Sequence, residues 1–126
     1  MVVLDSSAVI ALLNSEPGAD FVASRLSNAL LSAVNLQEIA KKMLEAGLAL
    51  GVIREAIDSL SIHILMHDAE DALLAASLAP VTKKFGRGLG DRSCMALAIK
   101  LGVPALTTDR AWKQIELPGL EVILAR

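Results

Sequence analysis

Short apolar runs alternate along the chain with longer segments in which apolar residues recur at the period of a helix. The longer segments span residues 7–14, 19–28, 35–46, 52–60, 69–85, 92–101 and 111–115. The short runs span residues 2–4, 30–33, 62–66, 104–107 and 121–124. These runs are apolar throughout, which is typical of strands covered on both faces. Strands separated by helices predict βαβ units, and therefore a three-layer α/β/α domain with a mainly parallel sheet of about five strands.

Composition favours one folded domain in a reducing compartment. The 126 residues, 54% of them hydrophobic, suit a single domain over positions 1–126 with a substantial core. No uncharged apolar stretch approaches the ~20 residues of a membrane span. The opening residues lack the basic leader of a signal peptide, and the only cysteine, Cys94, has no partner for an internal disulfide. We therefore expect a cytoplasmic protein with no membrane association.

Four acidic residues lie where the predicted strands meet the predicted helices. Asp5 ends the first run in "MVVLDSSAVI", and Asp109 ends the fourth in "PALTTDRAW". Glu38 is near the start of the helix after the second run, and Asp91 opens the helix that leads into the fourth. Right-handed crossovers bring the carboxyl ends of parallel strands to one edge, where α/β sheets carry their sites. The four carboxylates are therefore expected to face one crevice.

Each of these acids also has a purely structural interpretation. Asp5, Asp91 and Asp109 precede helical segments and suit the N-cap, a role worth ~1 kcal/mol. Glu38 suits the far end of a capping box that begins at Asn35. All strand-to-helix caps of a parallel α/β fold lie at the same edge, so position alone does not choose between capping and a shared site.

Helical phase separates two of the acids. Asp91 is in register with Cys94 and Ala98, so its carboxylate is directed toward the core. A carboxylate there needs a hydrogen bond, a cation or a metal ion, because burying it uncompensated is costly. Glu38 lies opposite the apolar stripe of its helix, which predicts a side chain in solvent. That stripe consists of Leu36, Ile39, Ala40, Met43 and Leu44.

The chemistry of the set points to a hard divalent cation. Three or four carboxylates without a neighbouring His or Cys suit Mg²⁺ or Mn²⁺ better than Zn²⁺. Such an ion lowers the pKa of a bound water and neutralises charge on a phosphodiester. The set therefore indicates hydrolysis of phosphate esters.

Several segments together resemble one known family. "VVLDSSAVIALLNSEPG" is similar to the opening of PIN-domain ribonucleases, especially the VapC-like toxins of bacterial and archaeal toxin-antitoxin pairs. A Glu on the helix after the second strand, then "GLGDRSCMALA", then "LTTDRAW" follow in the family's order. The resemblance covers essentially the whole chain and implies a PIN-like fold.

The resemblance assigns roles residue by residue. It implies that Asp5 and Asp91 are the principal metal ligands and that the hydroxyls of Ser6 and Thr107 orient ligands or water. It implies an endoribonuclease in which a water activated by Mg²⁺ or Mn²⁺ attacks an RNA phosphodiester. It also implies a homodimer and a cognate antitoxin protein that occludes the site. The implied catalytic and metal-binding set is Asp5, Glu38, Asp91 and Asp109.

RNA would have to be held by local basic side chains. The net charge of −2 argues against bulk electrostatic attraction, and 2% aromatic residues argue against base stacking as the main device. The segment "VTKKFGRGLGDR" places Arg87 and Arg92 beside Asp91, and Arg110 adjoins Asp109. We predict these three arginines as RNA contacts. The two lysines of the segment are equally well explained as cations at a helix C-terminus.

Other functions match less well, and one stays open. A phosphoacceptor signalling domain needs an acidic pair near the first strand and a Lys after a late strand, and neither is in place. A phosphatase with an Asp nucleophile needs a second Asp at the position of Ser7. A non-catalytic PIN-like module for protein interaction remains the alternative. Trp112 suits either the core or a partner interface.

Overall fold

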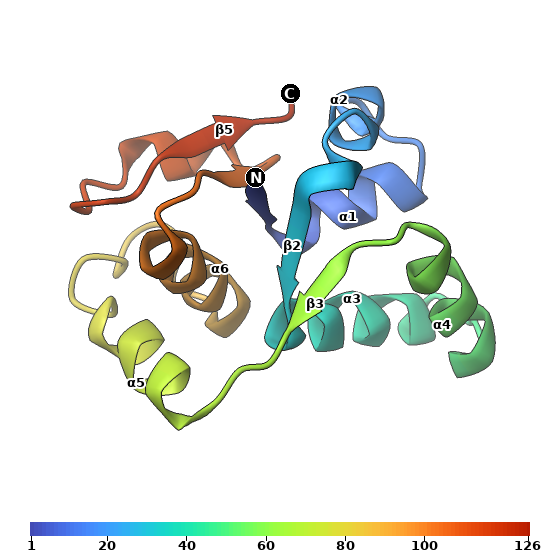
Figure 1. Cartoon of the computed structure of the whole chain (residues 1–126), viewed down its shortest axis with the longest axis horizontal. Helices are drawn as coiled ribbons and strands as arrows, with labels where there is room; N and C mark the ends of the chain where they lie inside the picture. The colour runs from blue at the N-terminus through green and yellow to red at the C-terminus, as the bar shows by residue number, and fades with distance from the viewer.

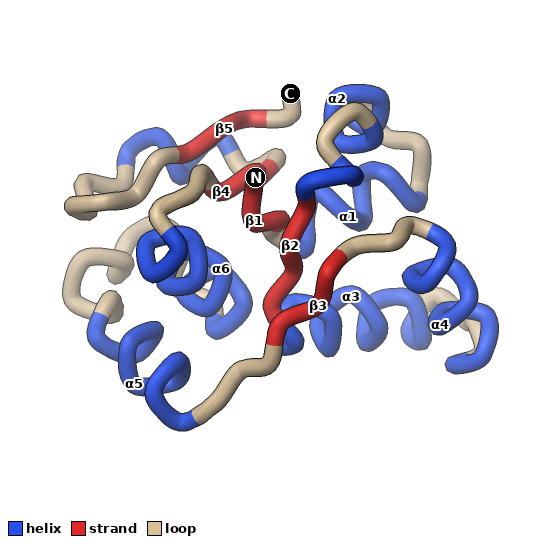
Figure 2. Tube along the Cα trace, viewed as in Figure 1, coloured by secondary structure: helices blue, strands red, loops and turns tan.

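The computed structural model describes all 126 residues, and its strands form one parallel sheet. The sheet order is β3-β2-β1-β4-β5, and every neighbouring pair is parallel. Figure 2 shows the strands passing through the middle of the molecule between helices. The predicted α/β/α class with a parallel five-stranded sheet is confirmed. The strands are β1 (Val2–Leu4), β2 (Ala29–Ser32), β3 (His63–Leu65), β4 (Ala105–Thr107) and β5 (Val122–Leu124).

Helices cover both faces of the sheet. In Figure 1, α1 to α4 lie to the right of β1 and β2, and α5 and α6 lie to their left, below β5. Two 3-10 helices, Leu26–Asn28 and Arg110–Gln114, complete the fold. None of the helices is long and apolar enough to cross a membrane. The α-helices are α1 (Ser6–Leu13), α2 (Ala19–Ala23), α3 (Ala33–Glu45), α4 (Leu50–Ser59), α5 (Ala69–Ser77) and α6 (Leu89–Leu101).

Alternate residues of β1 face two separate cores, as the period of a strand requires. Val2 and Leu4 pack with Ile39 of α3 in one core, and Val3 packs with α6 in the other. Trp112 has no exposed surface and belongs to the second core. The choice left open for Trp112 is thereby settled in favour of the core.

Two predicted helices differ from the observed ones. The segment 69–85 forms a helix only as far as Ser77, and a series of turns follows. Pro80 has no N–H to continue a helix and disfavours helical backbone in the residue before it. The segment 19–28 divides into α2 and a 3-10 helix. The turns before α6 carry the glycines that lead to Asp91 at the carboxyl edge of the sheet.

Candidate active site

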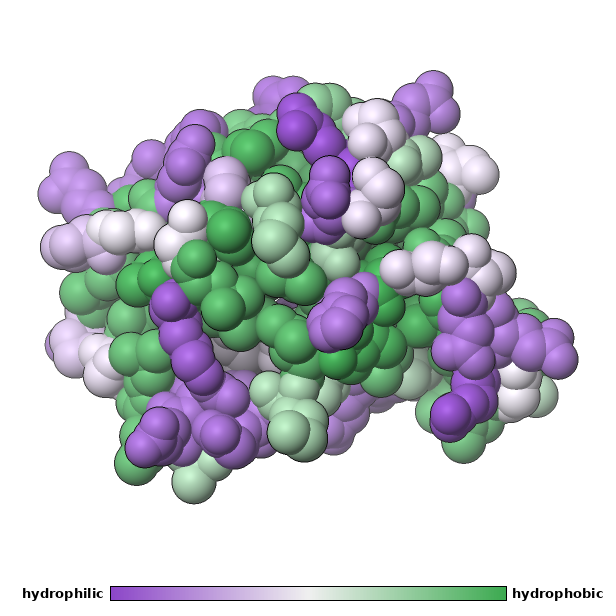
Figure 3. Space-filling model, in the orientation of Figure 1, coloured by the Kyte–Doolittle hydropathy of each residue, from purple (hydrophilic) through white to green (hydrophobic).

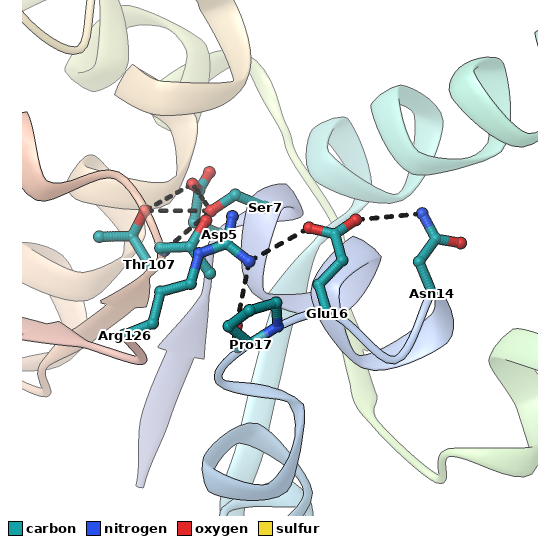
Figure 4. A network of polar contacts seen from close by, with 8 residues as sticks. Asp5, Ser7, Asn14, Glu16, Pro17, Thr107 and Arg126 are labelled. Atoms are coloured by element: carbon teal, nitrogen blue, oxygen red, sulfur yellow. Dashed lines mark hydrogen bonds and ion pairs between the residues drawn. The ribbon is translucent and has the colours of Figure 1, made fainter.

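Asp5 is a buried carboxylate at the carboxyl end of the central strand. Asp5 is only 3% exposed, and its carboxylate makes no capping hydrogen bond to the start of α1. Instead, Asp5 Oδ2 accepts hydrogen bonds from Ser7 Oγ at 2.7 Å and from Thr107 Oγ1 at 2.8 Å (Figure 4). Asp5 occupies the N-cap position without using its carboxylate as a cap, so capping does not account for this acid.

The surroundings of Asp5 oppose its charge. Burial raises the pKa of Asp5 to about 6, although the hydrogen bonds from Ser7 and Thr107 lower it. The negative charges of Asp91 and Glu38 raise the pKa of Asp5 further. These three carboxylates therefore lie close enough to repel one another, as the shared edge predicts.

Asp91 is the third residue of α6 and is half-buried. Its Oδ2 accepts a hydrogen bond from the backbone N–H of Gly88 at 3.1 Å. Burial raises the pKa of Asp91, the bond from Gly88 lowers it, and the charges of Glu38 and Asp109 raise it. Asp91 thus serves the helix terminus with one oxygen, while Oδ1 makes no hydrogen bond. Asp91 therefore caps α6 as predicted, but it does so as the third residue of the helix and not as the N-cap residue.

Glu38 lies against α6 and is only partly in solvent. The N-cap of α3 is Ser32, whose Oγ accepts from Val34 N–H at 3.2 Å, so the capping box expected from Asn35 is wrong. Glu38 is half-buried, and its Oε1 lies 2.6 Å from where a Cβ on Gly90 would be. The prediction of a solvated side chain holds only in part, because α3 packs against α6 as well as against the sheet.

Asp109 is a helix cap as well as a neighbour of the acids. Its Oδ1 accepts from Ala111 N–H at 3.0 Å at the start of the 3-10 helix, and the residue is exposed. Its own backbone N–H donates to Thr107 Oγ1 at 3.0 Å. The capping interpretation is confirmed for Asp109, and its charge still raises the pKa of Asp91.

Two polar residues at this edge were missed by the sequence analysis. Ser7 Oγ donates to Asp5, lies 3.1 Å from Thr107 Oγ1 and accepts from Thr108 N–H at 3.0 Å. Asn35 is completely buried, and its Nδ2 donates to Ser6 Oγ at 3.0 Å. The hydroxyl of Ser6 bonds to Asn35, not to Asp5. A hydroxyl two residues after Asp5 was the available signal for Ser7.

The predicted RNA contacts divide into two groups. Arg92 Nη1 donates to the carbonyl of Arg87, so these two residues lie together beside Asp91. The charge of Arg92 lowers the pKa of Asp91. Arg110 Nε donates instead to the carbonyl of Arg126 at 3.2 Å, which ties it to the last residues of the chain.

Comparison with known proteins assigns this fold to a family. The PIN domain family matches residues 2–117. The chain belongs to the PIN domain family. Its predicted resemblance to PIN domains is therefore confirmed, and no curated protein matches this PIN domain by sequence.

Solved structures share the PIN fold over almost the full chain. A chain of VapBC2 from Rickettsia felis, bound to a promoter DNA fragment, has a TM-score of 0.73 and 17% identity, covering 98% of each chain. A toxin-antitoxin complex from Klebsiella pneumoniae gives 0.75 and 15%, covering 100% of this chain and 98% of that one. FitAcB from Neisseria gonorrhoeae gives 0.71 and 20%, covering 99% and 98%. At these identities the likeness shows the shared fold.

The carboxylates of this PIN domain fit a hard cation in charge and donor type. Neither Asp5, Glu38, Asp91 nor Asp109 forms an ion pair, and among the neighbouring cations only the charge of Arg92 offsets the repulsion at Asp91. No three His, Cys, Asp or Glu side chains, however, stand in an arrangement that could hold a metal ion. The edge therefore offers carboxylate oxygens without an ion-pair partner that are not assembled into a metal centre.

Proposed function

We propose that this protein is an endoribonuclease that uses Mg²⁺ or Mn²⁺ and serves as the toxin of a toxin-antitoxin pair in the cytoplasm. The observation that carries the proposal is the burial of the Asp5 carboxylate among other acids. A nearly fully buried carboxylate, without a cation partner and repelled by Asp91 and Glu38, is expensive to keep ionised. A function that needs its charge explains why a PIN domain keeps it.

The proposed roles follow from where each side chain lies. Asp5 and Asp91 would hold the cation, with Glu38 and Asp109 at the rim of the set. When bound, a divalent cation supplies an activated water and neutralises charge on the phosphodiester. Thr107 and Ser7 both bond to the same oxygen of Asp5, which fixes the orientation of the carboxylate and leaves Oδ1 free to bind.

Substrate would be held by the basic side chains next to Asp91. Arg87 and Arg92 lie together at the start of α6 and would contact phosphates of the RNA. Arg110 is tied to the carbonyl of Arg126 and would have to release it to reach a phosphate. We therefore rank Arg110 below the other two arginines as an RNA contact.

Partner proteins are supported by exposed apolar side chains and by the solved structures. Leu50, Met66, Leu73 and Leu89 are 63%, 88%, 72% and 76% exposed. Figure 3 shows broad apolar areas between charged side chains on one face. Surfaces of this kind are typical of protein interaction sites. Because similar structures include members of toxin-antitoxin systems, we propose a cognate antitoxin for this chain. The exposed apolar side chains support the proposal of a homodimer.

A non-catalytic interaction module is the second candidate function. It is favoured by the absence of any three acids in a metal-holding arrangement. Under the nuclease proposal, Asp5 and Asp91 would hold the cation, with Glu38 and Asp109 at the rim of the set. The two functions therefore differ in whether a divalent ion binds at this edge at all.

Cleavage of a mixed RNA pool during titration with Mg²⁺ and Mn²⁺ separates the two functions. We expect wild type to cleave only with a divalent ion and Asp5→Asn to lose cleavage. Asp58→Asn is the matched control, because Asp58 is an exposed acid on α4 that pairs with Arg54 at 4.0 Å. A wild-type protein that cleaves nothing at any metal concentration would overturn the nuclease proposal and favour the interaction module.

A further inference from the structure

We propose that Asn35 is a positioning residue which, together with Gly90, sets Glu38 and Asp91 in place relative to Asp5. The inference rests on the proposed metal-dependent nuclease and assigns a role to two residues outside its acidic set. Asn35 and Gly90 belong to different helices, α3 and α6, and lie 55 positions apart in the chain. Both are buried at the carboxyl edge of the sheet.

Asn35 connects the three segments that carry Asp5, Glu38 and Asp91. Its Nδ2 donates to Ser6 Oγ at 3.0 Å and to the carbonyl of Gly90 at 3.1 Å. The backbone carbonyl of Asn35 accepts a hydrogen bond from the Ser6 hydroxyl at 3.3 Å. Ser6 follows Asp5, and Gly90 precedes Asp91. One amide thus holds the start of α1 and the start of α6 against α3.

The orientation of this amide is fixed by chemistry. A backbone carbonyl can only accept a hydrogen bond, so the group facing Gly90 has to be the NH₂ of Asn35. The other end, Oδ1, is buried and has no hydrogen-bond partner. A buried unpaired acceptor lowers stability, so Oδ1 by itself gives no reason for an asparagine here. The bonds from Nδ2 to Ser6 and Gly90 therefore explain why an asparagine occupies this position.

Gly90 allows the Glu38 carboxylate to approach α6. Its φ is outside the left-handed region, so the backbone does not require a glycine here. A Cβ at this position would lie 2.6 Å from Glu38 Oε1 and 2.9 Å from Glu38 Oε2. The carboxylate occupies the space that any side chain on residue 90 would fill. Because only the flexible end of Glu38 would have to move, a methyl group here displaces the carboxylate without displacing the helix.

Asn35 and Glu38 therefore hold the same glycine from one face of α3. They are three positions apart, and residues at this spacing lie side by side on a helix. The amide fixes the carbonyl of Gly90, and the carboxylate rests over its Cα. This arrangement sets the separation of Glu38 from Asp91, the very next residue of α6.

A pair of glycine variants tests the role of Gly90. Gly90 is the second residue of α6, and Gly51 is the second residue of α4 with nothing within 4 Å of an added Cβ. We expect Gly90→Ala to weaken Mn²⁺ binding by roughly 10- to 100-fold, as loss of groups that orient metal ligands does. Gly51→Ala should bind Mn²⁺ like wild type. Binding is measured by calorimetry without RNA, alongside the Mn²⁺ concentration that gives half-maximal cleavage.

A second pair separates positioning from packing at Asn35. Asn35→Leu keeps the approximate shape and removes the amide, and Ile39→Leu alters the fully buried residue one turn further along α3. We expect Asn35→Leu to weaken Mn²⁺ binding about tenfold or more. Its thermal midpoint should fall only modestly, because Ser6 Oγ and the Gly90 carbonyl lose a donor while the unpaired Oδ1 is removed. Ile39→Leu should leave Mn²⁺ binding unchanged. Loss of thermal stability in Asn35→Leu without loss of Mn²⁺ affinity would overturn the positioning role of Asn35.

The outcomes distinguish this inference from the function on which it rests. A wild type that neither binds Mn²⁺ nor cleaves RNA overturns both. A wild type that does both, with Gly90→Ala and Asn35→Leu equal to it, overturns the positioning role alone. If circular dichroism shows that one of these variants does not fold, the other decides.

Discussion

The hydroxyl of Thr107 donates a 2.8 Å hydrogen bond to the carboxylate of Asp5 across 102 positions of sequence. The bond joins the ends of β4 and β1, two neighbouring strands of the sheet. It lowers the pKa of a carboxylate that burial raises. Thr107 therefore favours the charged form that metal binding needs.

Replacing Thr107 by valine should weaken catalysis more than folding. Thr107→Val keeps the shape but loses the donor to Asp5 and the acceptor for the Asp109 N–H. We expect a loss of about 1 kcal/mol in the free energy of unfolding and a roughly 10- to 100-fold slower cleavage. Urea unfolding and RNA cleavage at fixed Mg²⁺ measure the two effects.

The matched control for Thr107→Val is the next residue along the chain. The side chain of Thr108 makes no hydrogen bond, and only its backbone N–H bonds to Ser7. Thr108→Val should keep wild-type cleavage. Equal rates in the two variants would contradict an orienting role for Thr107.

Asp5→Asn should stabilise the metal-free protein while removing its activity. The folded-state pKa of Asp5, about 6, exceeds the ordinary value of 3.8. Folding is therefore favoured by this group at low pH, and that stability is lost as pH rises through about 6. At pH 7.5 the ionised Asp5 costs about 3 kcal/mol, part of which the neutral amide recovers. Urea unfolding without metal should show a higher free energy of unfolding for Asp5→Asn.

Two further measurements make the Asp5→Asn comparison specific. The difference between variant and wild type should shrink as pH falls from 7.5 toward 4, because wild-type Asp5 then becomes neutral as well. Added Mg²⁺ should stabilise wild type and not the variant. A variant less stable than wild type at pH 7.5 would show that the charge itself holds the fold together.

Affinity for Mn²⁺ should fall as Asp5 takes up a proton. Because the pKa of Asp5 is about 6, we expect Mn²⁺ affinity to decrease about tenfold per pH unit below that value and to level off above it. Ser7→Ala removes a hydrogen bond that lowers the pKa of Asp5. The curve for Ser7→Ala should move to higher pH. Calorimetry between pH 5 and 8 at constant ionic strength gives both curves, and coincident curves would exclude Ser7 as a support of Asp5.

Asp109 offers a way to separate capping from catalysis in one residue. Asn caps a helix about as well as Asp, so Asp109→Asn should keep the stability of wild type. Asp109→Ala should lose about 1 kcal/mol, because Asp109 Oδ1 accepts from Ala111 N–H. If Asp109 also acts on the metal, Asp109→Asn cleaves more slowly than wild type at its unchanged stability. Full activity in Asp109→Asn would reduce this residue to a cap.

The sheet and its active edge were predictable because they follow from local pattern and chain direction. Five apolar runs gave five strands, and the shared carboxyl edge placed Asp5, Asp91 and Asp109 near one another. The position of Glu38 was not predictable from the phase of α3. The helical phase predicts only which face of α3 packs on the sheet. Glu38 instead packs against α6, where Gly90 has no side chain to exclude its carboxylate.

Hydrogen bonds between residues far apart in the chain could also not be predicted from the sequence pattern. Asn35 lies among the apolar residues of α3, and its partners Ser6 and Gly90 are 29 and 55 positions away. Ser7 reaches Thr107 across 100 positions. Trp112 could be placed only once its surroundings in the second core were known. Such pairings depend on how the helices pack against one another, and the periodicity of a single segment does not predict that packing.

The order of strands in the sheet also sets when the edge is completed during synthesis. β1 is made first, but one of its two neighbours, β4, begins only at Ala105. Until then, Asp5 lacks the hydrogen bond from Thr107, and the central strand is open on one side. Pairings between distant segments form late in folding. A nascent or prematurely terminated chain therefore does not acquire the site that we propose cleaves RNA.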